Sequence, residues 1–240
     1  MFIGNSNLMN KFSKIQLILT ILILIVGCKP TNKQLSIFSS SPCQLPCWQD
    51  IYPGKTTKGE VINILSKLDF VDIETIVTRG EPWSIFDDGV IATLQSGKIK
   101  TEIYFKGDQV SLIGLSGNID MEFSQAIQNF GEPKYIINTP MSGGMPLAPT
   151  SSFYIVAIDP EQGYEFSFDT RDLPNKLKNE IQPETMLSRI SFFDPNDYEK
   201  ILNAGIFSTP YLTGEETLRF MTPWSGYGSI LEKYPPAIIK

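Results

Sequence analysis

Hydrophobic and polar residues alternate along much of the middle of the chain. The clearest run is residues 99–106, in which Ile99, Ile103 and Phe105 are separated by polar or charged neighbours. A period of two predicts an antiparallel strand with one buried face and one solvated face. Similar runs predict further strands, at residues 70–78, 90–94, 110–115, 135–138, 152–158, 164–168 and 187–193.

Two dipeptides between the first predicted strands are typical of hairpin turns. Ser96-Gly97 and Gly107-Asp108 each lie between two β-like runs. Glycine adopts the positive φ angles that two-residue hairpin turns require. The strands on either side of these turns are therefore expected to form an antiparallel meander.

Two other segments carry a helical stripe with apolar residues at i, i+3, i+4 and i+7. The first is residues 57–68, which begin with the capping box Thr57-Lys58-Gly59-Glu60. Its apolar positions are Val61, Ile64, Leu65 and Leu68. The same spacing recurs in a second stripe, Phe123, Ala126, Ile127 and Phe130. Gly131 and Pro133 follow the second stripe and favour a helix end there.

A helix followed by four strands thus occurs twice. This order predicts an α+β fold of two tandem helix-plus-antiparallel-sheet units, at residues 43–117 and 118–194. A short helical C-terminal tail, residues 195–240, follows, with one helix after Asp194-Pro195 and another running from Thr213 to Met221. The aromatic residues expected to pack back onto the sheet are Trp224, Tyr227 and Tyr234.

The N-terminal stretch has the order of charge and hydrophobicity found in export signals. Lys11 and Lys14 precede an aliphatic run at residues 15–26, which is followed by Gly27-Cys28. The run has the length of a signal-peptide core and is shorter than the ~20 residues that a membrane-spanning helix requires. The segment Leu24-Ile25-Val26-Gly27-Cys28 resembles the lipobox of bacterial lipoproteins.

This resemblance implies lipid attachment at one residue. Residues 1–27 would be removed as a signal peptide, and Cys28 would carry a diacylglyceryl thioether, with palmitate among the acyl chains. Residues 28–42 are polar and serine-rich, which predicts a tether between membrane and folded body. Met9 is a more typical start of such a signal than Met1. We therefore expect an exported lipoprotein at the outer membrane or cell surface. The alternative is an ordinary signal peptide or a short anchor helix with an incidental cysteine.

The net charge of the mature chain restricts the kinds of partner that it can bind. The sequence has 20 basic and 26 acidic residues, and removal of residues 1–27 takes away Lys11 and Lys14 but no acid, which leaves a net charge of −8. A net acidic body argues against binding to nucleic acid and against electrostatic attraction to anionic lipid. The lipid on Cys28 is then expected to hold the protein at the membrane.

Two cysteines remain after Cys28. Cys43 and Cys47 form an even pair, which outside the cytoplasm predicts a disulfide. A redox pair or half of a metal site is the alternative. The three-residue gap differs from thioredoxin-like motifs, and the chain has no histidine for a Cys-His zinc site. A structural disulfide is the favoured interpretation, with no metal and no cofactor expected.

The common catalytic motifs are missing from the sequence. Serine hydrolysis needs a base beside the nucleophile, but there is no histidine, no Ser-x-x-Lys and no Gly-x-Ser-x-Gly. Asp87-Asp88 could form a carboxylate pair, but adjacent side chains on an extended chain point apart, so a solvated turn is favoured. The sequence therefore predicts a protein that is not an enzyme.

Two apolar loops are the candidate binding surface. Residues 139–150 are rich in proline and glycine and contain Met141, Met145 and Leu147, and the corresponding loop of the first unit contains Trp83. Methionine and aromatic side chains suit an adaptable protein-binding edge. The alternative is that both loops fold over the sheet and complete its core, as we expect for the tryptophans Trp48 and Trp224.

The two predicted α+β units also resemble a known group of small exported proteins. Gly54-Lys55-Thr56-Thr57 before a helix, and a helix ending in Phe130-Gly131-Glu132-Pro133, are similar to the α+β units of the β-lactamase-inhibitor-protein and outer-membrane-assembly small-lipoprotein group. The resemblance implies a sheet packed on short helices and a role in binding other proteins. No binding residue of that group can be matched here.

These features predict a lipid-anchored envelope protein that acts as a non-enzymatic protein-binding module, with an envelope protein as partner. The alternative is an extracytoplasmic binder of a small molecule or carbohydrate, with Trp83 and Trp224 near acidic residues in a cleft. A mainly structural envelope protein is a third interpretation.

Overall fold

Nine strands form one antiparallel sheet within the residues that the computed structural model describes, which are 36–39, 43–80, 85–95, 97–141, 152–173, 179–207 and 214–236. The strand order is β1-β2-β3-β4-β9-β7-β6-β5-β10. Residues Ile37–Lys240 belong to one unit. The predicted α+β class with an antiparallel sheet is confirmed.

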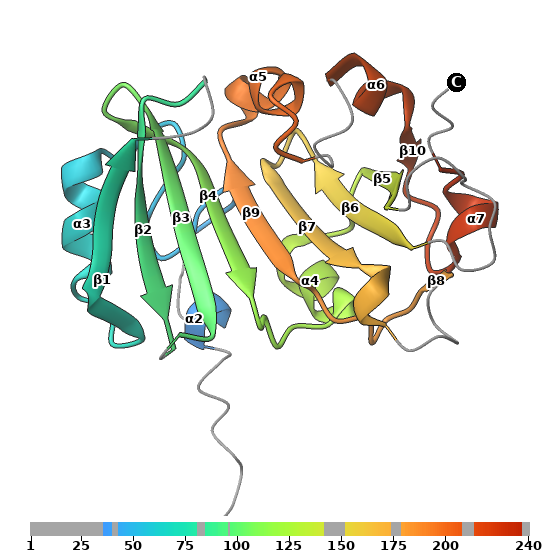
Figure 1. The fold of residues 1–240 in the computed structure, drawn as a ribbon, viewed down its shortest axis with the longest axis horizontal. Helices are drawn as coiled ribbons and strands as arrows, with labels where there is room; N and C mark the ends of the chain where they lie inside the picture. The colour runs from blue at the N-terminus through green and yellow to red at the C-terminus, as the bar shows by residue number, and fades with distance from the viewer. Residues whose placement is uncertain are drawn as a thin grey trace, which may run out of the picture. The chain divides into compact units, whose positions relative to one another are not determined.

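The first half of the sheet is the predicted meander (Figure 1). Its strands are β1 (Val71–Gly80), β2 (Asp88–Leu94), β3 (Ile99–Lys106) and β4 (Gln109–Gly117). Gly97 and Gly107, at the two predicted turns, have φ angles of +91° and +62°. These left-handed angles explain why glycine occupies both turns.

The second half joins the first through the pairing of β4 with β9, in which Gly114 faces Ser191. Its strands are β5 (Tyr135–Pro140), β6 (Phe153–Asp159), β7 (Tyr164–Asp169) and β9 (Arg189–Phe193). Three short strands were not predicted: β10 (Met221–Pro223), which pairs with β5, and β8 (Glu180–Ile181) and β11 (Gly228–Ser229), which pair with each other.

The helices are short. They are α2 (Ser36–Ser39), α3 (Lys58–Leu65), α4 (Phe123–Phe130), α5 (Tyr198–Asn203), α6 (Gly214–Arg219) and α7 (Ile230–Lys233), with 3-10 turns η1 (Thr170–Asp172) and η2 (Pro195–Asp197). The predicted capping box is confirmed, because the Thr57 backbone N–H donates to Glu60 Oε2 at 2.8 Å. Gly131, with a φ of +96°, follows α4 as predicted.

Two predicted helices extend too far. The helix predicted at residues 57–68 ends at Leu65. Met221 lies in β10, and α6 ends at Arg219. Pro223 disfavours helical backbone at the residue before it and has no N–H to donate. The chain therefore becomes extended at Met221 and pairs with β5 at the sheet edge, where a proline is tolerated.

The main core lies between the sheet and α3 and α4, which Figure 1 shows behind the sheet. Phe123 is fully buried at its centre, with its ring 4.9 Å from that of Phe166 and 5.4 Å from that of Trp224. Trp224 in turn stacks on Tyr234 with ring centroids 5.9 Å apart. The predicted packing of the aromatic tail onto the folded body is confirmed.

A second, smaller core covers part of the opposite face of the sheet. It joins Leu112 and Phe193 to Ile201 of α5 and to Phe207. Alternation along each strand divides the side chains between the two faces, so Ile113 and Phe192 point to the main core while Leu112 and Phe193 point to the second. We call the face that carries the second core the α5 face.

The folded body begins earlier than predicted. The sequence predicts a tether over residues 28–42, but Ile37 is fully buried and packs in the main core. Its carbonyl accepts hydrogen bonds from Trp48 Nε1 at 3.1 Å and Gln49 Nε2 at 2.8 Å. The apolar pair Ile37-Phe38 explains the difference, because its burial favours ordering this segment. Among the described residues, none of the helices is long and apolar enough to span a membrane.

Cys43 and Cys47 form the predicted disulfide, with their Cα atoms 5.7 Å apart. The bridged loop contacts the second half of the sheet, because a Cβ built on Gly163 would lie 2.9 Å from Pro46 Cβ. Gly163 has a φ of +71°, and its missing side chain leaves the space that Pro46 occupies.

Replacing both cysteines, Cys43 and Cys47, with serine is expected to lower the free energy of unfolding by about 2 kcal/mol. The bridge closes a short loop, so it removes little entropy from the unfolded chain. Urea unfolding of the full-length protein in detergent measures the change. Reduction of the wild-type protein with dithiothreitol is the control and should lower the midpoint equally; an unchanged midpoint in both would contradict the prediction.

Candidate functional site

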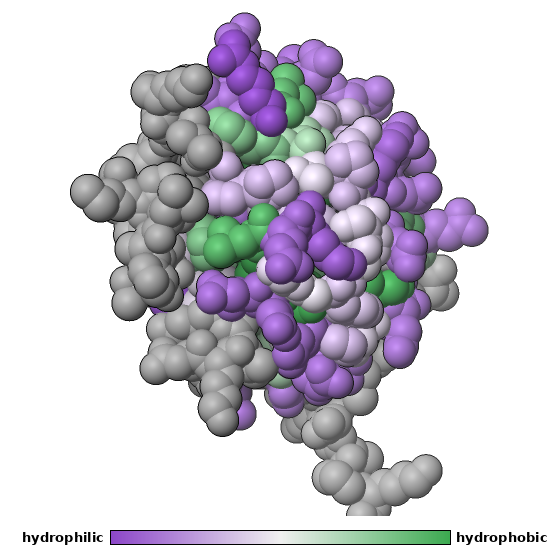
Figure 2. All heavy atoms as spheres, turned by 90° about the vertical axis from the view of Figure 1, so that its right-hand side faces the viewer, coloured by the Kyte–Doolittle hydropathy of each residue, from purple (hydrophilic) through white to green (hydrophobic). Residues whose placement is uncertain are grey.

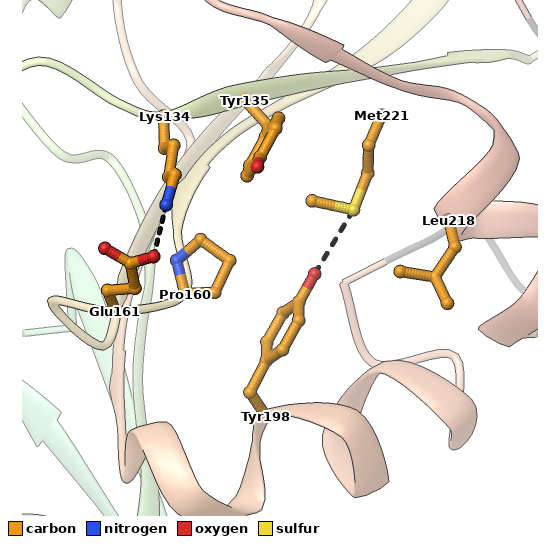
Figure 3. A pocket seen from close by; sticks show the side chains of 7 residues that line it. All are labelled: Lys134, Tyr135, Pro160, Glu161, Tyr198, Leu218 and Met221. Atoms are coloured by element: carbon orange, nitrogen blue, oxygen red, sulfur yellow. Dashed lines mark hydrogen bonds and ion pairs between the residues drawn. The ribbon is translucent and has the colours of Figure 1, made fainter.

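An open groove lies at one end of the α5 face. Its volume is about 390 Å³, within the range of small-ligand sites. It is lined by Lys134, Tyr135, Pro160, Glu161, Tyr198, Leu218 and Met221. Figure 3 shows Lys134, Pro160 and Glu161 on one side of the groove and Leu218 on the other, with the two tyrosines and Met221 between them.

Local structure explains how the sequence builds the first side. Lys134 immediately precedes β5, and Glu161 lies in the turn between β6 and β7. Asp159 closes this turn, since its Oδ1 accepts hydrogen bonds from the backbone N–H groups of Glu161 at 2.9 Å and Gln162 at 3.0 Å. Antiparallel pairing of β5 with β6 then brings the start of one strand beside the end of the other.

Lys134 and Glu161 form an ion pair at this side. Their side chains are 39% and 74% exposed, so the pair contributes little to stability. The hydrogen bond to Glu161 raises the pKa of Lys134. Lys134 Nζ also lies 5.9 Å from the centre of the Tyr135 ring. Both charges are accessible to a molecule bound in the groove.

Tyr198 and Met221 form the floor. The Tyr198 hydroxyl donates to Met221 Sδ at 3.3 Å, and a thioether is a weak acceptor. Burial, together with nearby Tyr135 and Glu199, raises the pKa of Tyr198 to about 12, so this hydroxyl keeps its proton at neutral pH. The Tyr198 ring stacks on Phe193, with centroids 5.9 Å apart. The floor of the groove is thus the outer surface of the second core.

A buried charged cluster lies on the same face of the sheet. Glu165 of β7 is 1% exposed, and its Oε1 accepts a hydrogen bond from Ser191 Oγ at 2.7 Å and lies 3.3 Å from Arg189 Nε. Arg189 Nε also donates to Ser191 Oγ at 3.1 Å. The guanidinium lies beside Gly114, since a Cβ built there would be in van der Waals contact with Arg189 Nη2 at 3.5 Å.

The cluster extends to both sides of Arg189. On one side the Tyr154 hydroxyl is 2.8 Å from Ser167 Oγ. On the other, Lys100 Nζ donates to Glu102 Oε1 at 2.6 Å. Burial works to raise the pKa of Glu102, but the hydrogen bond and charge of Lys100 outweigh it and the pKa is lowered.

The pKa of Glu165 shifts in the opposite direction from that of Glu102, because Glu165 is fully buried. Burial raises the pKa of Glu165, and the charge of Arg189 and the hydrogen bond from Ser191 offset only part of that rise. Its Oε2 is buried without a hydrogen-bond partner among the described residues. A buried carboxylate with one unsatisfied oxygen depends on the charge of Arg189, because an unpaired buried charge is strongly destabilising. The cluster is a structural element beside the groove.

The sites predicted from the sequence lie elsewhere or outside the described residues. Cys28, Trp83, Met145 and Leu147 belong to the residues that the structure does not describe. Met141 is half-buried, and its backbone N–H donates to Ser152 O at 2.8 Å, which continues the pairing of β5 with β6. Met141 is therefore held by backbone pairing at the end of a strand.

The remaining candidates have structural partners. The sulfurs of Cys43 and Cys47 lie within 4.8 Å of an Asp50 carboxylate oxygen, but the disulfide occupies both sulfurs. Asp88 forms an ion pair with Lys58, and Asp87 Oδ2 accepts a hydrogen bond from the Gly107 N–H at 2.5 Å. Trp48 is 2% exposed, as predicted for a core residue.

Sequence reasoning missed the groove. Its residues come from five elements or turns, and none of them forms a motif with its sequence neighbours. The sequence feature that could have indicated the groove is the pair Lys134-Tyr135, a charged residue and an aromatic residue at the start of a predicted strand. No protein-family model, no curated protein and no solved structure matches this chain.

Proposed function

We propose that this protein is an exported, lipid-anchored envelope protein that binds another protein through the groove on the α5 face. The single observation that carries the proposal is the lining of that groove. Two tyrosines, a methionine, a leucine and a proline line it, with one exposed ion pair on one side. Tyrosine and methionine are enriched at protein interfaces, and a floor of this kind excludes water from a bound side chain.

The location of the protein is part of the same proposal. The order of charge, aliphatic run and Gly27-Cys28 supports export and acylation at Cys28. The mature net charge of −8 gives the body no attraction to anionic lipid or nucleic acid. A lipid on Cys28 would therefore bring an acidic body close to the membrane, where an envelope protein is available as a partner.

We also propose that the body arose by tandem duplication of one α+β unit. Three features support the proposal. First, α3 precedes β1–β4 as α4 precedes β5, β6, β7 and β9, and second, the two meanders meet through β4 and β9. Third, the residue before each helix makes an isolated β-bridge, Thr57 with Gln109 and Glu122 with Met186. In a crystal structure of the mature protein the two halves should superpose strand for strand in this order; a superposition with another strand order would contradict duplication.

Replacing Leu218 with Glu tests the groove. Leu218 is 52% exposed on one side of it, so the substitution should change stability by no more than about 0.5 kcal/mol. A carboxylate there would be desolvated by a bound partner and is expected to weaken binding tenfold or more. Crosslinking of the tagged full-length protein in intact cells, followed by quantitative mass spectrometry, measures the loss.

The matched control is Leu231→Glu. Leu231 is 41% exposed on α7 and does not line the groove. A partner that Leu218→Glu loses and Leu231→Glu retains supports the proposal. If both variants retain the same partners at wild-type levels, the groove is not the binding site.

The second candidate function is binding of a small molecule or carbohydrate. The volume of about 390 Å³, the tyrosine rings and the exposed Lys134–Glu161 pair favour it. Stabilisation against heat by neutral oligosaccharides, lost in Leu218→Glu, would favour this function over protein binding. A melting temperature that no oligosaccharide changes would remove it.

A further inference from the structure

The groove presents hydrogen-bond donors from two tyrosine hydroxyls and one lysine. Within the described residues the Tyr135 hydroxyl has no hydrogen-bond partner, and the Tyr198 hydroxyl donates only to a thioether. Lys134 adds a charged donor, and Glu161 supplies the carboxylate. A ligand that matches these donors offers several carbonyl acceptors.

The shape and the apolar lining restrict the ligand further. Pro160 and Leu218 lie on opposite sides of the groove, and the Tyr135 ring and Met221 lie between them (Figure 3). Figure 2 shows hydrophobic side chains in separate patches among hydrophilic ones on the side of the body that carries β10, α6 and α7. Separate patches fit a narrow extended ligand better than a broad apolar interface, which would need contiguous hydrophobic surface.

Acidic side chains lie close to both ends of the polar lining. Asp159 lies close enough to raise the pKa of Lys134, although the hydrogen bond to Glu161 has the larger effect. Glu199 contributes in the same way to the raised pKa of Tyr198, whose main cause is burial. Glu161, whose side chain is 74% exposed, is the carboxylate of the lining and would attract a basic side chain.

We propose that the groove binds a proline-rich segment of a protein partner, in the extended polyproline II conformation and with a basic residue beside the prolines. Such a segment presents carbonyl acceptors and few N–H donors, and it packs proline rings between aromatic side chains. Tyr135 and Tyr198 donate to its carbonyls, and Glu161 receives the basic side chain. The inference rests on the proposed protein-binding function and specifies the chemistry of the partner.

Peptide binding to the full-length protein in detergent tests this inference. The probe is a fluorescent twelve-residue peptide rich in proline with one arginine, and fluorescence anisotropy gives its affinity. Removing both hydroxyls with Tyr135→Phe and Tyr198→Phe should weaken binding about tenfold, because two hydrogen bonds are lost while the rings remain. Tyr52→Phe, at a half-buried tyrosine outside the groove, is the matched control and should leave the affinity unchanged.

Two changes in the peptide separate the contribution of its prolines to binding from that of its arginine. Replacing its prolines with alanine should abolish measurable binding, and replacing its arginine with glutamate should weaken binding about tenfold. Glu161→Gln should weaken only the arginine peptide, about threefold. Wild-type affinity in the double tyrosine variant, or displacement of the peptide by a neutral oligosaccharide that itself binds, would overturn the inference. If the peptide fails to bind while Leu218→Glu still loses a crosslinked partner, this inference is wrong and the proposed function stands.

Discussion

Replacing Arg189 with Met is expected to lower the free energy of unfolding by about 3 kcal/mol. The substitution leaves the Glu165 carboxylate buried beside Ser191 without a positive charge. Breaking a buried ion pair typically costs 3–5 kcal/mol, and we expect the lower end because the Arg189 side chain is 26% exposed. Urea unfolding at neutral pH measures the loss.

The loss should also depend on pH. The folded-state pKa of Glu165 is raised by burial, and removal of Arg189 raises it further. Between the ordinary value of 4.5 and the raised value, the folded protein holds a proton on Glu165 that the unfolded chain has released. Stability from this group is therefore present at low pH and falls as pH increases through this window. The effect of Arg189→Met should accordingly be smaller at pH 4.5 than at pH 7.

Two further variants distinguish the buried pair from a general effect of losing arginine. Arg189→Met combined with Glu165→Gln removes both charges and keeps an acceptor for Ser191, so it should recover more than half of the lost stability. Arg171→Met removes a guanidinium that is 60% exposed beside Asp169 and should cost less than about 1 kcal/mol. Equal losses in Arg189→Met and Arg171→Met would show that burial of the pair is unimportant.

The regular part of the fold could be predicted because its signals are local. The alternation around Ile103, the glycines of the hairpin turns and the apolar stripe that starts at Phe123 each depend on neighbouring residues only. The structure has strands, turns and helices at these places. Strands of two or three residues, such as β8 and β11, are too short for a period of two to be visible.

The charged cluster and the groove could not be predicted, because pairing between distant strands creates them. Glu165 and Arg189 each occupy an ordinary polar position in an alternating strand. Only the pairing of β7 with β9 brings them onto one face, where their neighbours bury them. In the same way, Lys134 meets Glu161 through the antiparallel pairing of β5 with β6. The order of the strands in the sheet cannot be predicted from the local patterns of a single sequence.

Replacing Cys28 with Ser is expected to abolish lipid attachment. Serine has no thiol to form the thioether, so labelling with radioactive palmitate should disappear and the chain should accumulate as the longer precursor. Two or three acyl chains hold a protein stably at a membrane, whereas a single chain binds only marginally. Mass spectrometry of the membrane fraction measures both the lipid and the cleavage site.

The matched control for Cys28→Ser is replacement of Cys43 and Cys47 with serine. These cysteines are bonded to each other in the folded body, so their loss should leave palmitate labelling and membrane association at wild-type levels. Together the variants separate a lipid anchor from any other cysteine-dependent association. A mature, membrane-bound protein of wild-type mass in Cys28→Ser would contradict the anchor, because the acidic body has no charge-based attraction to a lipid surface.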